Sequence, residues 1–168
     1  MDPENALAEP GNGRVMRLGN ATDHDALGEL MFDAVRNGHS PYSEAQRAAW
    51  VPEPRSGAAW NERLSPQTIV LEEHGGTIRA FMTLRDDGYI DFAYIRPACR
   101  GAGLFRKLFD EIRRIAVARG DRRLWVHASL MAQPAFSAMG FQIIRRETVE
   151  IGDQFLDRFE MEMTLTGD

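Results

Sequence analysis

An amphipathic segment between two strand-like runs is the feature that most limits how this chain can fold. Apolar residues recur at helical spacing over residues 104–116, charged residues occupy the other face, and Gly120 ends the segment. Short, largely apolar runs at 89–95 and 123–128 flank it. A helix between two strands of one sheet brings the second strand back parallel to the first, so the sequence predicts a β-α-β unit.

The segments on either side of this unit predict a sheet of mixed direction. Strand-like runs at 68–72 and 77–84 precede residues 89–95, and short turns containing Gly or Asp join them. This spacing is typical of an antiparallel meander. Further strands are expected at 15–18, 142–151 and 156–165.

Several shorter segments are expected to form helices. Thr22 and Ser43 are the expected caps of two of them, a third lies around Trp60, and a fourth covers residues 132–139. The predicted fold class is therefore α/β (α+β), with one mixed, mostly antiparallel central sheet and helices on both faces.

Length and composition restrict the function classes. The 168 residues fit one domain, expected over 14–168, after a flexible N-terminal tail at 1–13. The net charge of -5 argues against nucleic acid as a partner. The single cysteine, Cys99, excludes an intrachain disulfide framework and a cysteine zinc site, and no metal is expected. Without an apolar run near roughly 18 residues or a signal-peptide pattern, we expect a cytoplasmic protein with no membrane partner.

The sharpest local signal is a Gly-containing turn between the strand at 89–95 and the amphipathic helix. Glycines let the backbone approach a ligand closely, and the free N–H groups at a helix start favour an anion. A pyrophosphate fits such a site, and an ordinary Gly-rich turn without a ligand is the alternative. The turn and its flanking cations comprise Arg100, Gly101, Ala102, Gly103, Leu104, Phe105 and Arg106.

Residues 95–104 resemble the acetyl-CoA pyrophosphate loop of the GNAT acyltransferase superfamily, which reads Gln/Arg-x-x-Gly-x-Gly/Ala. Arg100 and Gly103 match this pattern, and Phe105 replaces the final small residue. Residues 129–141 resemble a second family segment, Asn-x-x-Ala-x-x-x-Tyr-x-x-x-Gly-Phe, in which Ala132, Gly140 and Phe141 match. Two motifs in the right order make the resemblance fairly specific, and it covers residues 14–165.

The resemblance implies a fold, a cosubstrate and a reaction. The parallel strands would splay apart, and the pantetheine of acetyl-CoA would pair with backbone near Tyr94 and Ile95. A primary amine of a small molecule or peptide would attack the thioester directly in a ternary complex. Ser129 stands where the family often has an Asn that contacts CoA, and Phe136 where it often has the Tyr that protonates the departing thiolate. We expect both to lie at the cofactor, with a Phe136→Tyr variant tolerated in an open cleft.

Three residues are the candidates for catalysis. Asp91 interrupts an apolar strand and is the first candidate for the base, acting through water, whereas pairing with an arginine is the alternative. His127 lies on the parallel partner strand and is the second candidate, with an ordinary hydrogen-bonded histidine as the alternative. Because Phe136 cannot donate a proton, the acid would be Tyr42, Tyr94, Ser129 or water.

Two other functions are compatible with these motifs. A CoA-binding module with little or no catalysis is the main alternative, and Phe136 is the reason for it. A nucleotide- or phosphate-binding protein unrelated to CoA is the third, but the Gly turn lacks the Lys-Ser/Thr of a P-loop. Cys99 is expected to have no function. The sequence leaves open the acceptor and the choice between a monomer and a homodimer.

Overall fold

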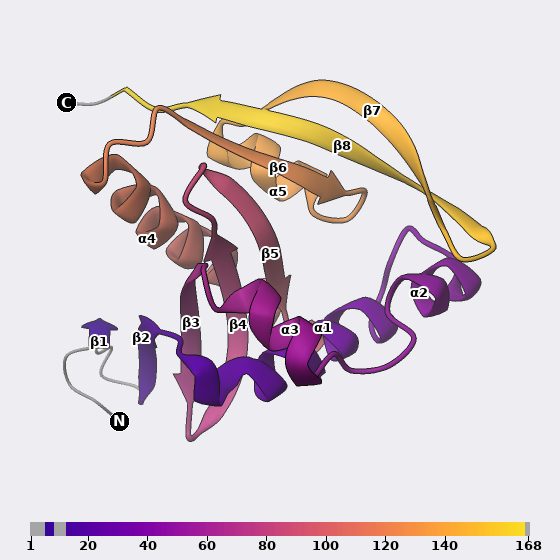
Figure 1. Cartoon of the computed structure of the whole chain (residues 1–168), viewed down its shortest axis with the longest axis horizontal. Coiled ribbons are helices and arrows are strands. Elements are labelled where there is room, and N and C mark those ends of the chain that lie inside the picture. Colours follow the sequence, from indigo (N-terminus) through magenta and orange to yellow (C-terminus); the bar gives the residue numbers. More distant parts are fainter. Residues whose placement is uncertain (1–5, 9–12, 167–168) are drawn as a thin grey trace.

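A computed structural model of the chain describes residues 6–8 and 13–166, and within them one eight-stranded sheet runs through the molecule (Figure 1). Its strands are β1 (Ala6–Ala8), β2 (Arg14–Leu18), β3 (Thr68–His74), β4 (Thr77–Leu84), β5 (Tyr89–Ile95), β6 (Arg123–Ser129), β7 (Gln142–Ile151) and β8 (Gln154–Thr164). Their order across the sheet is β1-β2-β3-β4-β5-β6-β8-β7. The mixed α/β fold expected from the sequence is confirmed.

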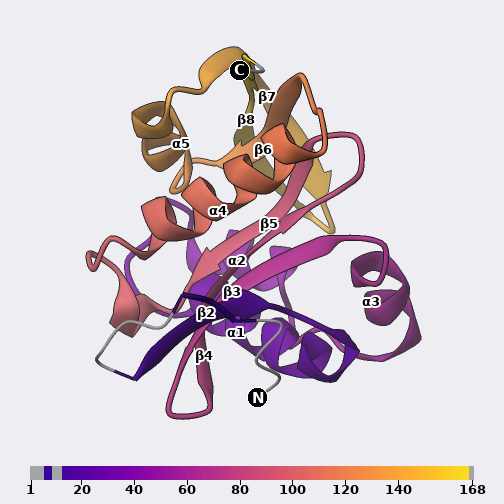
Figure 2. The ribbon, with the colours of Figure 1, turned by 90° about the vertical axis from the view of Figure 1, so that its left-hand side faces the viewer.

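The helices cover both faces of the sheet. They are α1 (His24–Arg36), α2 (Glu44–Trp50), α3 (Gly57–Leu64), α4 (Leu104–Ala118) and α5 (Gln133–Met139), with short 3-10 turns η2 (Ala21–Asp23) and η3 (Pro97–Cys99). Figure 2 shows α4 and α5 on one side of the sheet and α1 and α3 on the other. No helix in the described part of the chain is both long and apolar enough to cross a membrane.

Strand alternation divides the buried residues into two cores. Met82 of β4 packs in a cluster with Leu108 and Ile112 of α4, whereas its neighbour Phe81 packs in a second cluster with Leu30 of α1. Successive side chains of a strand point to opposite faces of the sheet, so a single strand such as β4 contributes side chains to both cores. The sheet is thus fixed between two apolar layers, which gives the site a rigid support.

Helix caps match the sequence in one case and differ in another. Ser43 caps α2 as predicted, because its hydroxyl accepts from Gln46 N and the Gln46 side chain accepts from Ser43 N. The prediction that Thr22 caps the first helix is wrong. Asn20 caps η2 instead, accepting from Thr22 N, while Asp23 accepts from Asn20 N. The first helical turn therefore begins earlier than the apolar periodicity of α1 indicates.

The expected flexible tail at 1–13 is partly replaced by regular structure. Ala6–Ala8 forms β1 and pairs antiparallel with β2, with Ala6 opposite Arg17. An exposed strand edge offers unpaired N–H and C=O groups, and β1 satisfies part of that edge. The expectation for 1–5 and 9–12, and for the domain end at 167–168, lies outside the described residues.

The parallel pair β5–β6 splays apart shortly after it begins. Tyr89 lies opposite Trp125 and Ile90 opposite Val126, and no later residues of the two strands are in register. Figure 1 shows the strands diverging from there, with α4 as the crossover between them. The β-α-β unit and its splay, expected from the sequence and from the family resemblance, are confirmed. The later backbone of β5 is consequently free of a neighbour on its β6 side.

Candidate active site

Two cavities meet at the splay between β5 and β6. The first, of about 210 Å³, runs along β5 from the start of α4 to the β6–α5 connection, and its lining is mostly apolar. The second, of about 150 Å³, lies among α3, β5, β6 and the β7–β8 hairpin, and its lining mixes polar and apolar side chains. We call them the donor cavity and the acceptor cavity. Four residues line both, namely Tyr42, Trp50, Tyr94 and Ser129.

The Gly turn before α4 has the conformation that a backbone anion site requires. Gly101 and Gly103 have φ values of 82° and 77°, in the left-handed region that favours glycine. Gly103 is the N-cap of α4, whose first N–H groups have no intrahelical partner. A Cβ built on either glycine meets no heavy atom within 4 Å. Both glycines are therefore required by conformation, with open space beside them.

The residues expected at the cofactor fall into two groups. Side chains of Tyr94, Ile95, Arg100, Phe105 and Ser129 line the donor cavity. Those of Ala102 and Arg106 are exposed beside Gly101 and Gly103, whereas the Leu104 side chain is buried in the core. Leu104 can therefore contact a ligand only through its backbone N–H.

Arg100 attaches the Gly turn to the end of α1. Its guanidinium donates to the backbone carbonyls of Ala34, at 2.8 Å, and His39, at 3.5 Å. Burial lowers the pKa of Arg100, although an arginine stays charged at any physiological pH. A direct contact between Arg100 and a pyrophosphate stays a prediction, and the observed role is to hold the turn in place.

Phe136 lies in the core and not in an open cleft. Its side chain is 1% exposed and lines neither cavity. The ring packs edge-on against Phe105 and Phe141, at centroid distances of 4.9 and 5.1 Å. The short helix α5 turns Ala132 and Ala135 toward the donor cavity, and this leaves position 136 facing inward. The expectation of an open environment for Phe136 is wrong.

Asp91 lines the acceptor cavity in a pair with an arginine, which was the alternative interpretation of this residue. Arg63 of α3 donates to both carboxylate oxygens, at 3.0 and 2.8 Å, and Gln67 donates a third hydrogen bond at 2.8 Å. The Asp91 side chain is only 6% exposed. Both oxygens are thus already occupied as acceptors, which leaves the carboxylate poorly placed to receive a substrate proton.

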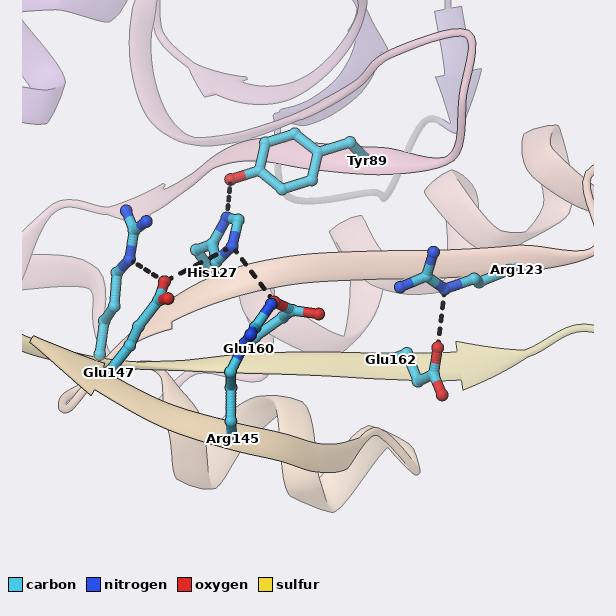
Figure 3. Close-up of polar contacts among 8 residues, drawn as sticks. Tyr89, Arg123, His127, Arg145, Glu147, Glu160 and Glu162 are labelled. Carbon is cyan, nitrogen blue, oxygen red and sulfur yellow. Dashed lines mark hydrogen bonds and ion pairs between the residues drawn. The ribbon is translucent and has the colours of Figure 1, made fainter.

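His127 connects the acceptor cavity to a set of polar residues on four strands (Figure 3). Its Nδ1 lies 2.8 Å from the Tyr89 hydroxyl of β5, which also lines the cavity. Its Nε2 lies 3.6 Å from Glu147 of β7 and 3.8 Å from Glu160 of β8. Two carboxylates on this side favour an Nε2–H, so the Tyr89 hydroxyl donates to Nδ1.

The surroundings favour a neutral His127, an ionised Glu147 and a protonated Tyr89. Burial, followed by the charge of Arg158, lowers the pKa of His127, and Glu147 and Glu160 act in the opposite direction. A hydrogen bond from Arg158 lowers the pKa of Glu147. Burial raises the pKa of Tyr89, so the phenol keeps its proton. A neutral imidazole next to carboxylates can accept a proton and be stabilised when it does.

Tyr42 is held by the backbone on two sides. Its hydroxyl donates to the Asp157 carbonyl of β8 and accepts from Leu130 N, after β6. Burial raises the pKa of Tyr42. These contacts tie the β7–β8 hairpin to the β6–α5 connection, and they leave the Tyr42 proton engaged. Its expected role as an acid stays a prediction.

The sequence pointed to His127 but not to its partners. Tyr89, Glu147 and Glu160 come together because β6 pairs with β8 and β8 with β7, which places His127 opposite Glu160 and Arg145 opposite Glu160 in turn. Charged and apolar residues alternate along β8, which predicts a strand with one polar face. This alternation does not predict which strands are the neighbours of β8 in the sheet.

Comparisons with known proteins agree with this geometry. A family model described as "Acetyltransferase (GNAT) domain" matches residues 39–165. YafP of Escherichia coli, an uncharacterized N-acetyltransferase, is 26% identical over 120 residues, which are 71% of this chain and 75% of YafP. A GCN5-related N-acetyltransferase of Rhodopseudomonas palustris superposes with a TM-score of 0.84 at 26% identity, over 94% of this chain and 99% of that one.

A further solved structure shares the fold at lower identity. The phosphinothricin acetyltransferase of Sinorhizobium meliloti, solved in complex with acetyl-CoA, has a TM-score of 0.69 at 20% identity, over 91% of this chain and 89% of that one. The family match spans the Gly turn, the splayed strands and the lining of both cavities except the residues of α1. The expectation of an acetyl-CoA-dependent acetyltransferase is thus confirmed at the level of the family. The chain belongs to the GNAT acetyltransferases.

Proposed function

We propose that the protein transfers an acetyl group from acetyl-CoA to a primary amine, in a ternary complex. The observation that carries this proposal is the meeting of the donor and acceptor cavities at Tyr42, Trp50, Tyr94 and Ser129. A thioester reached from one cavity and an amine reached from the other would touch only there. Bringing the two reactants together in this way makes the reaction effectively unimolecular.

The donor cavity fits the two ends of acetyl-CoA. Its apolar walls suit the pantetheine chain, and the unpaired backbone of β5 beyond Ile90 can pair with the amides of that chain. The Gly turn at the start of α4 offers N–H groups and a helix dipole to the pyrophosphate. When bound, acetyl-CoA supplies the acetyl thioester, and the protein residues orient it.

We assign the base to His127, acting through Tyr89, rather than to Asp91. The amine attacks the thioester carbon, a C–N bond forms, and the C–S bond breaks with its electron pair leaving on the CoA sulfur, which takes a proton from water to become the thiol. The proton lost by the amine passes to the Tyr89 oxygen as the Tyr89 proton moves to His127 Nδ1, over the 2.8 Å hydrogen bond. Glu147 and Glu160 stabilise the imidazolium formed. Asp91 is assigned to holding Arg63.

Tyr94 is the donor that best suits the thioester itself. It lines both cavities, and its hydroxyl has no hydrogen bond to another protein group in the described part of the chain. Burial raises its pKa, so the phenol stays protonated and able to donate at the transfer point. Ser129, whose oxygen accepts from Ala132 N, also lies at this junction.

Release of CoA thiol tests the function. With a panel of primary amines, the purified protein should release thiol from acetyl-CoA at a rate that depends on the amine. Tight binding of acetyl-CoA without thiol release for any amine would instead support the CoA-binding module. We propose the cytoplasm as the compartment.

A further inference from the structure

The acceptor cavity is rich in guanidinium groups, although the chain as a whole is acidic. Arg55, Arg63 and Arg158 line it, and among the described residues Asp91 is the one carboxylate in its lining. The chain has a net charge of -5, so this lining differs from the average surface. Concentrating cations in one cavity favours an anionic ligand there.

Two of these three arginines are already paired. Arg63 binds Asp91 at 2.8 Å, and Arg158 binds Glu147 at 2.7 Å. For Arg55, the described part of the chain provides neither a hydrogen bond to the guanidinium nor an ion pair. Glu53, the nearest acid along the chain, lines a neighbouring cavity with Arg55 without pairing with it. Arg55 is therefore the cation whose hydrogen-bond donors are available to a ligand.

Arg55 is held in position by close backbone packing and by a cation–π contact. Its backbone carbonyl packs against α1 so closely that a Cβ built on Gly28 would lie 1.8 Å from it. Its guanidinium lies over the Trp60 ring at 5.8 Å from the centroid, and Trp60 packs edge-on against Phe92. A cation above an aromatic face keeps its N–H edges free for an anion. These contacts present Arg55 to the cavity at little further ordering cost.

Arg55 shares one small cavity with the transfer point. Arg55 and Tyr94 both line the acceptor cavity of about 150 Å³, and Tyr94 also lines the donor cavity. Burial lowers the pKa of Arg55 and outweighs the favourable charge of Asp91, which forms no ion pair with it, so an anion bound to Arg55 would offset a desolvation cost. The anion would therefore lie a short distance from the reacting amine.

We propose that the acceptor carries an oxyanion group, a carboxylate or a phosphate, within a few bonds of its amine, and that Arg55 binds this group. The inference rests on the proposed amine acetylation. It defines the substrate class as small amino acids or similarly anionic amines. The planar guanidinium can hold two oxygens of either group at once, which fixes the direction of the amine.

Matched acceptor pairs test this class. Leucine is compared with leucinamide, and phosphoethanolamine with ethanolamine, by thiol release from acetyl-CoA. The anionic member of at least one pair should have a kcat/KM about 10- to 100-fold higher, the range for a hydrogen bond to a charged group. The amine of leucinamide is the more acidic, so amine availability at neutral pH would favour the amide. A preference for leucine must then come from binding.

Variants of Arg55 separate the inference from the proposed function. Arg55→Gln should lower kcat/KM for the anionic acceptor about 10- to 100-fold and leave the neutral partner within a few-fold. Arg55→Lys, which keeps the charge, should recover part of the loss. Arg113→Gln, on the exposed face of α4, removes the same charge at a position that does not line the cavity. It should leave kcat/KM unchanged for both the anionic and the neutral acceptor.

Each outcome has a defined meaning. If neutral and anionic acceptors react equally, or Arg55→Gln slows both alike, the oxyanion site is wrong while amine acetylation stands. If no amine in the panel releases thiol, the proposed function itself is wrong. Circular dichroism and acetyl-CoA affinity of the Arg55→Gln protein should match the wild type, which excludes a folding defect as the cause.

Discussion

At the scale of single residues, the acceptor cavity depends on which polar groups are already engaged. Asp91 has both oxygens occupied by Arg63 and Gln67, whereas His127 keeps a neutral ring beside two carboxylates. The sequence identified both residues as base candidates and ranked Asp91 first, an order that our proposal reverses. Their order depends on partners in α3, β7 and β8, which are distant along the chain.

Replacing His127 with Gln should lower kcat about 10²-fold with little change in acetyl-CoA affinity, since the base acts only on the amine proton. Burial lowers the pKa of His127, so its ring stays neutral to a more acidic pH than an ordinary histidine does. The wild-type rate should therefore fall once the pH is acidic enough to protonate His127, and the His127→Gln profile should lack this acid limb. Rates measured over pH 5 to 9 check both points.

Tyr89→Phe provides the companion variant, because Tyr89 and His127 act as one unit in this scheme. The double variant should be no slower than the slower single variant, since removing either residue breaks the same relay. Losses that multiply in the double variant would show that the two residues act independently. If the His127→Gln variant had the wild-type rate, the base would have to be another group.

Phe136→Tyr should destabilise the fold by about 1–3 kcal/mol, because its hydroxyl would be buried without a partner. Phe136 is 1% exposed and packed between Phe105 and Phe141. Phe155→Tyr is the matched control, since that ring is 60% exposed and an added hydroxyl would remain in water. Thermal unfolding of the two variants compares them. A Phe136→Tyr protein as stable as the wild type would contradict the buried position.

At the scale of elements, the sequence predicted most helices and strands because each has its own periodicity. The limits of β4, β5 and β7 follow the expected ranges, and Gly120 does end α4. Two errors have a common cause. Asn20, rather than Thr22, begins the first helix, and Ala6–Ala8 forms a strand, because a capping box and an edge pairing depend on local partners and not on apolar spacing.

The start of α4 gives an element-scale prediction. Gly103→Ala should weaken acetyl-CoA binding, because an alanine disfavours the φ of 77° that aims the first N–H groups of the helix. Gly120→Ala is a close control at the other end of α4. Its φ is 86°, and a Cβ there also meets nothing within 4 Å. Both variants should lose about 1–2 kcal/mol of stability.

Calorimetry with acetyl-CoA distinguishes the two glycines. Only Gly103→Ala should raise the dissociation constant, by about tenfold or more, if the turn binds pyrophosphate through its backbone. Equal affinity in the two folded variants would mean that the turn does not contact the cosubstrate. A loss of affinity in both would indicate that α4 as a whole had shifted.

At the scale of the whole molecule, the sheet order creates the site. The splay of β5 and β6 opens the donor cavity, and the β7–β8 hairpin closes the acceptor cavity by contact with α2, where Gln46 donates to the Phe155 carbonyl. The two family motifs predicted the donor side from sequence alone. The sequence named Asp91 and His127, but it could not predict the acceptor cavity around them, because the lining comes from seven helices and strands whose lateral order no local pattern records.

The most direct test of the account is the pattern of initial rates over a matrix of acetyl-CoA and amine concentrations. Direct transfer between two adjoining cavities predicts double-reciprocal lines that intersect, because both substrates must be bound at once. It also predicts that Cys99→Ala keeps the wild-type rate, since no acetyl group passes through the enzyme's thiol. Parallel lines, together with an acetylated protein isolated in the absence of amine, would contradict it.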